Sequence, residues 1–226
     1  MSTGEARVET TRYVGPSPLA PAGAYVALFV ASLVVGGAAG GFSTPATSAA
    51  DVVAAAAKHP GTGHFVAVLQ LAAAVGLGVF AAASIGVIRS RGVDVAGLQI
   101  ARFGGYGAAM LLALSAISGW CTIELAQVNE PGAAKATSLL AFVCGGPAHV
   151  VFLGLFMAGV SVPTLLARLV PRWISILGLV LALVAAVSLL SLGVSQLQIL
   201  LPIVRFPSLI WTVAAAATVG GWGRDR

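Results

Sequence analysis

The chain has 226 residues, of which 58% are hydrophobic and only 8% are charged. Its mean hydropathy of +1.00 lies far above that of soluble globular proteins, so the composition excludes a water-soluble domain as the main structure. The net charge of +5 comes from basic residues scattered beside apolar runs, with no basic stripe, and we therefore exclude nucleic acid as a partner.

A tail of residues 1–21 precedes the first apolar run. Pro16, Pro18 and Pro21 interrupt this tail and it has few apolar residues, so we expect it to be disordered and cytoplasmic. The run that follows, 22–42, has 21 residues and exceeds the hydrophobic segment of a signal peptide. We therefore expect a retained helix and not a cleaved signal.

Six apolar segments occupy residues 22–222 and predict an all-α, polytopic transmembrane helix bundle. A helix needs about 20 residues to cross a hydrocarbon core of about 30 Å. The last uncharged stretch, 206–222, has only 17 residues, so we begin its helix near Leu200, which places Arg205 just inside one membrane boundary. The expected spans are 22–42, 65–88, 103–127, 138–162, 173–194 and 200–222.

A short helix is also expected outside the membrane, between the first two spans. Ser48 and Asp51 have the spacing of a capping box, in which a serine hydroxyl caps the first helical turn. Lys58, His59 and Pro60 then supply a helix end. The sequence therefore predicts a surface helix at 49–58.

Orientation follows from the basic residues, because Lys and Arg in short loops remain on the cytoplasmic side. One side of the predicted topology holds nine of the 12 basic residues, and the other holds Lys58, Lys135 and Arg205. The nine are Arg7, Arg12, Arg89, Arg91, Arg102, Arg168, Arg172, Arg224 and Arg226. The imbalance predicts six spans with both termini in the cytoplasm.

Closely spaced glycines near the end of the first span suggest a helix contact surface. Gly36 with Gly40, and Gly37 with Gly41, have the G-x-x-x-G spacing that lets two helix backbones approach. Two interpretations stay open: packing within the bundle, and a face for a homo-oligomer or a partner subunit. The lipid bilayer is the other expected partner.

Five short motifs point to a known family. They are 58–60 (KHP), 145–155 (GGPAHVVFLGL), 171–173 (PRW), 177–179 (LGL) and 206–211 (FPSLIW). Together they resemble a bacterial family of six-helix integral membrane proteins known only as a domain of unknown function. The resemblance implies a six-helix fold in a bacterial plasma membrane, and it implies no activity.

Few polar side chains lie at membrane depth, and such groups are functional candidates because hydrocarbon disfavours them. Glu124 and Arg205 lie at similar depths below the outer surface, and two interpretations stay open: an ion pair between them, and two side chains that each face interfacial water. Gln70 and His64 would complete a polar layer that either binds a ligand or contacts interfacial water. His149, the deepest titratable group, is expected to make a hydrogen bond to a neighbouring helix, with a proton relay as the alternative.

The chain has no sequence motif of a catalytic, cofactor or metal site. There is no G-x-S-x-G elbow, zinc motif, phosphate-binding loop or dinucleotide fingerprint, and we predict no enzyme, no cofactor and no metal. Cys121 and Cys144 fall at matching depths, so both a disulfide and two buried free thiols stay open.

Three function classes are compatible with these features. The first is a packing or accessory role, such as a subunit of a larger membrane complex. The alternative is a small transporter or ligand-binding bundle with an outer polar site at Glu124 and Arg205. An intramembrane enzyme ranks last, because His149 has no evident catalytic partner at its depth.

Overall fold

The computed structural model describes residues 13 and 15–221, and these residues form helices and turns without β-strands. The tail predicted to be disordered lies mostly outside the described residues, and its last residues, from Leu19 on, belong to the first helix. The helices are α1 Leu19–Ala38, α2 Ala49–Lys58, α3 Pro60–Ser90, α4 Ala96–Gln127, α5 Pro131–Val143, η1 Cys144–Ala148, α6 His149–Leu166, α7 Arg172–Ser188, η2 Leu189–Leu192, η3 Ser195–Ile199 and α8 Leu200–Gly221.

Six helical segments of the described chain are long and apolar enough to cross a membrane. They are Leu19–Ala38, Pro60–Ser90, Ala96–Gln127, Pro131–Leu166, Arg172–Leu192 and Ser195–Val219. Large apolar side chains such as Val34, Met110 and Leu183 are exposed on the outside of the bundle, where water would be unfavourable and lipid favourable. By length and composition, the chain is therefore an all-α integral membrane protein.

The helices differ from the expected spans mainly at their ends. The second, third and fourth spans begin about one and a half to two turns earlier than expected, at Pro60, Ala96 and Pro131. A charge-free run measures only the part of a helix in hydrocarbon, whereas helical hydrogen bonding continues into the polar boundary. The first span ends at Ala38 and not at residue 42, because Gly40 and Gly41 adopt left-handed backbone angles, with φ of +119° and +87°.

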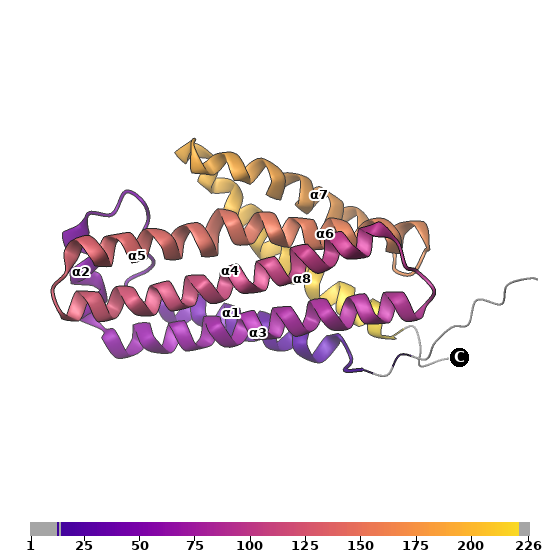
Figure 1. The fold of residues 1–226 in the computed structure, drawn as a ribbon, viewed down its shortest axis with the longest axis horizontal. Helices are drawn as coiled ribbons and strands as arrows, with labels where there is room; N and C mark the ends of the chain where they lie inside the picture. Colours follow the sequence, from indigo (N-terminus) through magenta and orange to yellow (C-terminus); the bar gives the residue numbers. More distant parts are fainter. Residues whose placement is uncertain (1–12, 14, 222–226) are drawn as a thin grey trace, which may run out of the picture.

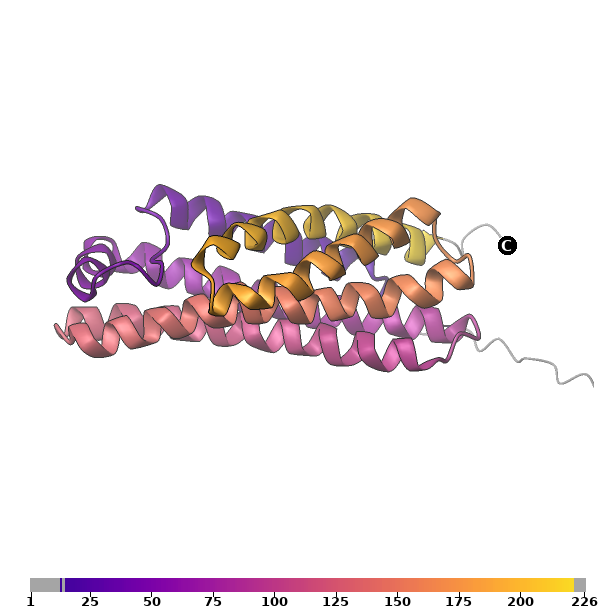
Figure 2. The same ribbon diagram turned by 90° about the horizontal axis from the view of Figure 1, so that it is seen from above.

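Helices α3, α4 and α6 lie side by side, α7 and α8 are inclined to them, and α5, η1 and α6 follow one another in line (Figure 1). The short helix α2 lies at one end of the bundle, here called the α2 end. The start of the described chain and the end of α8 lie together at the opposite end (Figures 1 and 2). There Arg91 donates a 2.6 Å hydrogen bond to the carbonyl of Val219, and burial lowers the pKa of its guanidinium.

An aromatic cluster holds α3, α6 and α8 together in the core. The Phe156 ring makes edge-to-face contacts with Phe80 at 5.5 Å and with Trp211 at 5.9 Å between ring centroids. The Trp211 indole also donates a 3.0 Å hydrogen bond to the Ile174 carbonyl on α7. A buried tryptophan whose N–H is satisfied orients its helix as well as filling space, so this cluster fixes how α8 faces the bundle.

The hairpin of α7 and α8 is shorter than the other hairpins. Its turn, formed by η2 and η3, stops well before the α2 end in both views (Figures 1 and 2). The turn has no charged residue, and Leu190, Leu192 and Ile199 are exposed on it. Part of its backbone is hydrogen-bonded within the turn, since the N–H groups of Gly193 and Val194 both donate to the Leu190 carbonyl. The turn is thus uncharged and carries both apolar and polar side chains.

Candidate functional site

The fourth span is broken inside the membrane. Residues Cys144–Ala148 form a π-helical turn, and Gly146 within it has non-helical backbone angles of φ −92° and ψ −109°. Pro147 has no N–H to donate, and its ring clashes with the carbonyl one turn earlier, so a regular α-helix cannot continue through it. Such π-helical turns leave backbone groups free for other partners and occur frequently at functional sites.

Arg205 of α8 fills the position opposite this break. Its guanidinium donates a hydrogen bond to the free carbonyl of Gly145. The same guanidinium lies over the Phe29 ring of α1, 5.5 Å from the ring centroid, at a cation–π distance. The Arg205 Nε is buried and has no hydrogen-bond partner. The arginine thus joins three spans while one of its donors stays unused.

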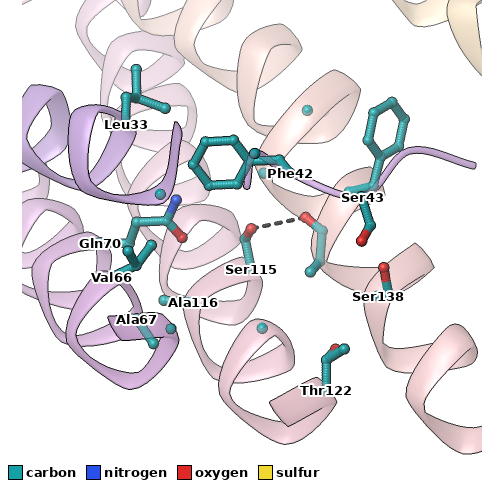
Figure 3. Close-up of a pocket in the computed structure, with 18 of the residues that line it drawn as sticks. Leu33, Phe42, Ser43, Val66, Ala67, Gln70, Ser115, Ala116, Thr122 and Ser138 are labelled. Carbon is teal, nitrogen blue, oxygen red and sulfur yellow. Dashed lines mark hydrogen bonds between the residues drawn. The ribbon is translucent and has the colours of Figure 1, made fainter. Parts of the chain in front are cut away.

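Helix α4 supports the break from the other side. The Ser115 hydroxyl donates a 2.8 Å hydrogen bond to the Ala141 carbonyl, one turn before the π-helical turn (Figure 3). A Cβ atom added to Gly145 would lie 2.3 Å from the Ser115 Oγ, so only glycine fits there without displacement. Gly145 therefore brings α4 and the broken span into direct contact.

A cavity of about 510 Å³ lies beside this arrangement, within the size range of small-molecule sites. Its walls come from α1, α3, α4, the broken span and the start of α8, and Arg205 is part of the lining. Apolar side chains form most of the wall, and polar groups are few. The apolar residues include Phe29, Leu33, Val66, Leu112, Phe142 and Leu201, and the polar ones include Gln70, Ser115, Thr122, Ser138 and Gln198.

The α2 end of the cavity is covered by the connection between α1 and α2. Phe42 folds back so that its ring lies against Gly36, and Figure 3 shows the ring on the same side of the cavity as Gln70 and Ser115. Gly40 and Gly41 make this reversal, because their positive φ angles suit glycine. Val52 and Ala55 of α2 complete the cover.

Lys135 of α5 holds this cover in place. Its ammonium donates to the carbonyls of Thr44, Pro45 and Thr47 at 3.3, 3.0 and 2.6 Å. The helix that follows is capped as its sequence predicts, because Asp51 N–H donates to the Ser48 hydroxyl at 3.2 Å. The observed α2 spans the residues expected for it, 49–58.

The predicted polar layer divides into two separate places. Gln70 and Arg205 both line the cavity, whereas His64 and Glu124 do not. Glu124 contacts His64, with 2.9 Å between Oε1 and Nε2, and the described residues show no ion pair between Glu124 and Arg205. The His64 Nε2 does not meet hydrogen-bond geometry, so this is a close contact and not a hydrogen bond. In place of a Glu124–Arg205 pair, Arg205 donates to a backbone carbonyl and Glu124 contacts His64.

His149 makes the hydrogen bond to a neighbouring helix that its sequence position predicts. Its Nδ1 lies 2.9 Å from the Ala108 carbonyl of α4, and since a carbonyl only accepts, Nδ1 carries the proton. The residue is fully buried, its Nε2 has no partner, and it is not part of the cavity lining. The observed contact supports a packing role.

Neither predicted G-x-x-x-G pair forms a helix face. Gly40 and Gly41 lie beyond the end of α1, so they cannot continue the surface begun by Gly36 and Gly37. Gly36, Gly40 and Gly41 line the cavity instead. The spacing predicts a contact between helices only if α1 continues through residues 40–41, where the chain instead makes a left-handed turn. The adjacent glycines at 40–41 are the sequence signal for that turn.

Cys121 and Cys144 are both free thiols, so the disulfide alternative is not formed. Cys144 is buried at the start of the π-helical turn. Across the described part of the chain, no three His, Cys, Asp or Glu side chains gather as a metal site would require.

Sequence reasoning missed the break in the fourth span and the cavity beside it. The signal was present in Gly145, Gly146 and Pro147, since two glycines before a proline interrupt a helix. Comparison of the chain with protein-family models, curated proteins and solved structures found no match.

Proposed function

We propose that this protein is a ligand-binding membrane bundle, which takes up a small and largely apolar molecule in the cavity at the α2 end. The observation that carries this proposal is the cavity of about 510 Å³ at a broken span. Backbone that leaves helical geometry at membrane depth is tolerated where it lines a cavity or is buried in protein. In many transporters such broken helices mark the substrate site.

The topology proposed with it has six spans, both termini in the cytoplasm and the α2 end outside. The basic-residue imbalance supports this orientation. The resemblance to the bacterial six-helix family supports a bacterial plasma membrane as the location. The proposal assigns binding, and no catalytic turnover, to the chain.

The accessory-subunit hypothesis loses its main support. It depended on glycine faces for contact with another chain, and two of the four glycines, Gly40 and Gly41, lie outside the helix. The ligand-binding hypothesis keeps Arg205 and Gln70 from its predicted site and loses Glu124 and His64. Ligand binding is therefore the function that the geometry supports best.

Filling the cavity tests the proposal. A Cβ atom on Gly119 would meet no atom within 4 Å, and Gly119 lines the cavity, so Gly119→Phe places a ring in the empty space without a clash at Cβ. The matched control is Gly23→Phe, because Gly23 also has open space at its Cβ but lies exposed on α1, away from the cavity.

The measurement is native mass spectrometry of the full chain purified gently in lipid nanodiscs. We expect the wild type and Gly23→Phe to retain a co-purifying small molecule, and Gly119→Phe to lose it. Equal retention by all three proteins, or no bound molecule in a wild type purified from its natural membrane, would contradict the proposal.

A further inference from the structure

Arg205 is a cation inside a membrane span without a carboxylate partner among the described residues. The two ion pairs found there are His64 with Glu124 and Arg89 with Asp94, and neither includes Arg205. Charged groups in spans are normally paired with opposite charge, because an unpaired charge in low dielectric is costly. One backbone carbonyl and one aromatic face compensate Arg205 only in part.

The unused capacity of Arg205 is available to the cavity. Its side chain is part of the lining, and its buried Nε has no hydrogen-bond partner. A guanidinium presents several N–H donors in a planar fork that matches carboxylate and phosphate oxygens. An anion with oxygens that accept from the guanidinium would supply the opposite charge that Arg205 lacks among the described residues.

The rest of the cavity suits an apolar body. Leu33, Leu112 and Phe142 line it on different helices. The polar side chains that line it besides Arg205 carry hydroxyls, amides or, at His59, an imidazole, and none carries a carboxylate. A free inorganic anion would leave most of this apolar wall unfilled. An anion joined to a hydrocarbon chain would contact both Arg205 and the apolar wall.

The short α7–α8 hairpin offers such a molecule a route from the lipid. Its apolar turn stops before the α2 end, and Gln198 and Leu201, at the end of the turn and the start of α8, line the cavity. Exposed Leu192 and Ile199 lie on the same turn. The cavity wall next to this turn thus lies beside exposed leucine and isoleucine side chains.

We propose that the cavity binds an amphiphile with a single anionic head group, a carboxylate or a phosphate, which is held by Arg205 while the apolar chain lies along Leu33, Leu112 and Phe142. This inference rests on the proposed ligand-binding function and names the ligand class of that site. The carbonyl of Gly145 and the ring of Phe29 hold the guanidinium in position for the head group.

The test compares two probes that differ only in charge. Decanoate and decanol have the same chain, and decanoate is ionised at mildly alkaline pH. Binding is measured by calorimetry on the full chain in nanodiscs of zwitterionic lipid. We expect the wild type to bind decanoate at least about tenfold more tightly than decanol, the ratio that a charge-assisted hydrogen bond of roughly 1.5 kcal/mol gives. Equal affinities would overturn the anion assignment, and this comparison needs no variant.

Variants of Arg205 then test whether this residue causes the preference for decanoate. Arg205→Gln should weaken decanoate binding about tenfold and leave decanol binding within about twofold, while Arg205→Lys should retain part of the preference for the anion. Decanoate binding unchanged in Arg205→Gln would overturn the role of this residue. Inorganic phosphate serves as the free-anion probe, and phosphate that binds as tightly as decanoate would overturn the amphiphile.

The outcomes separate this inference from the proposed function. If both probes bind equally in the wild type and both are lost in Gly119→Phe, the cavity is a ligand site and only the anionic class is wrong. If neither probe is affected by Gly119→Phe, the cavity itself is not the site.

Discussion

At the scale of a single residue, the hydrogen bond of His149 predicts which substitutions this position tolerates. The hydrogen bond to the Ala108 carbonyl uses Nδ1, and the amide nitrogen of asparagine occupies nearly the same place. We expect His149→Asn to keep most of the stability, and His149→Leu to lose about 1 kcal/mol. Thermal unfolding in one detergent compares them. Equal melting of His149→Leu and the wild type would show that the bond contributes nothing.

Glu124 and Arg205 are expected to act independently. Glu124 contacts His64, and the two side chains are 44% and 34% exposed, so Glu124→Gln should cost less than about 1 kcal/mol. In a double-mutant cycle with Arg205→Gln, the two effects should add to within about 0.5 kcal/mol. A larger coupling energy, measured by chemical unfolding, would mean that the two charges interact after all.

The residue types at these positions were predictable from the sequence, but their partners were not. Similar depth placed Glu124 and Arg205 in one layer, yet depth carries no information about which way a side chain faces around its helix. Arg205 donates to the carbonyl of Gly145, which lies in the π-helical turn of the fourth span. The acceptor is a backbone carbonyl, and because every residue has one, the sequence does not show which carbonyl an arginine will bind.

At the scale of the elements, the contact between α4 and the broken span is the most constrained. Gly145→Ala would place a Cβ 2.3 Å from Ser115 Oγ and should destabilise the protein by about 1–3 kcal/mol. Ser115→Gly, combined with it, should restore part of that loss by removing the clashing side chain.

The control for this prediction lies one turn from Ser115 on the same helix. The Cβ of Gly119→Ala meets no atom within 4 Å, so this variant should be neutral or slightly stabilising, as expected for alanine in a helix. The same melting experiment ranks all four proteins. Loss of stability in Gly119→Ala that matches Gly145→Ala would show a general intolerance of this helix and not a local contact.

The helical elements themselves follow from the sequence to different degrees. The apolar runs predict the spans because hydrocarbon requires them, and Ser48 with Asp51 predicts α2 through a local cap. The break at Pro147 and the early end of α1 depend on particular backbone angles at glycine. The length of an apolar run gives no information about such angles, so neither the break at Pro147 nor the early end of α1 was predicted.

At the scale of the whole molecule, the topology is open to a direct test. The first described residues and the end of α8 lie at the same end of the bundle, and the basic-residue imbalance predicts that this end faces the cytoplasm. Reporter fusions after Gly15 and after Gly223 should both report a cytoplasmic location. Opposite locations for the two fusions would mean an odd number of crossings.

The three bonds from Lys135 would slow the exchange of a bound molecule only on a route past the α1–α2 connection, and not on a route past the α7–α8 turn. The cover formed by Phe42 and α2 must move before the α2 end of the cavity opens, and the ammonium of Lys135 ties the cover to α5. Lys135→Met removes the donors and keeps the length of the side chain. Stopped-flow measurement should then show faster release of decanoate and a shorter residence time, with a smaller change in the equilibrium constant because the walls and Arg205 are unaltered. An unchanged release rate would mean that exchange runs past the α7–α8 turn, so the membrane and not the outer solution would supply and receive the ligand.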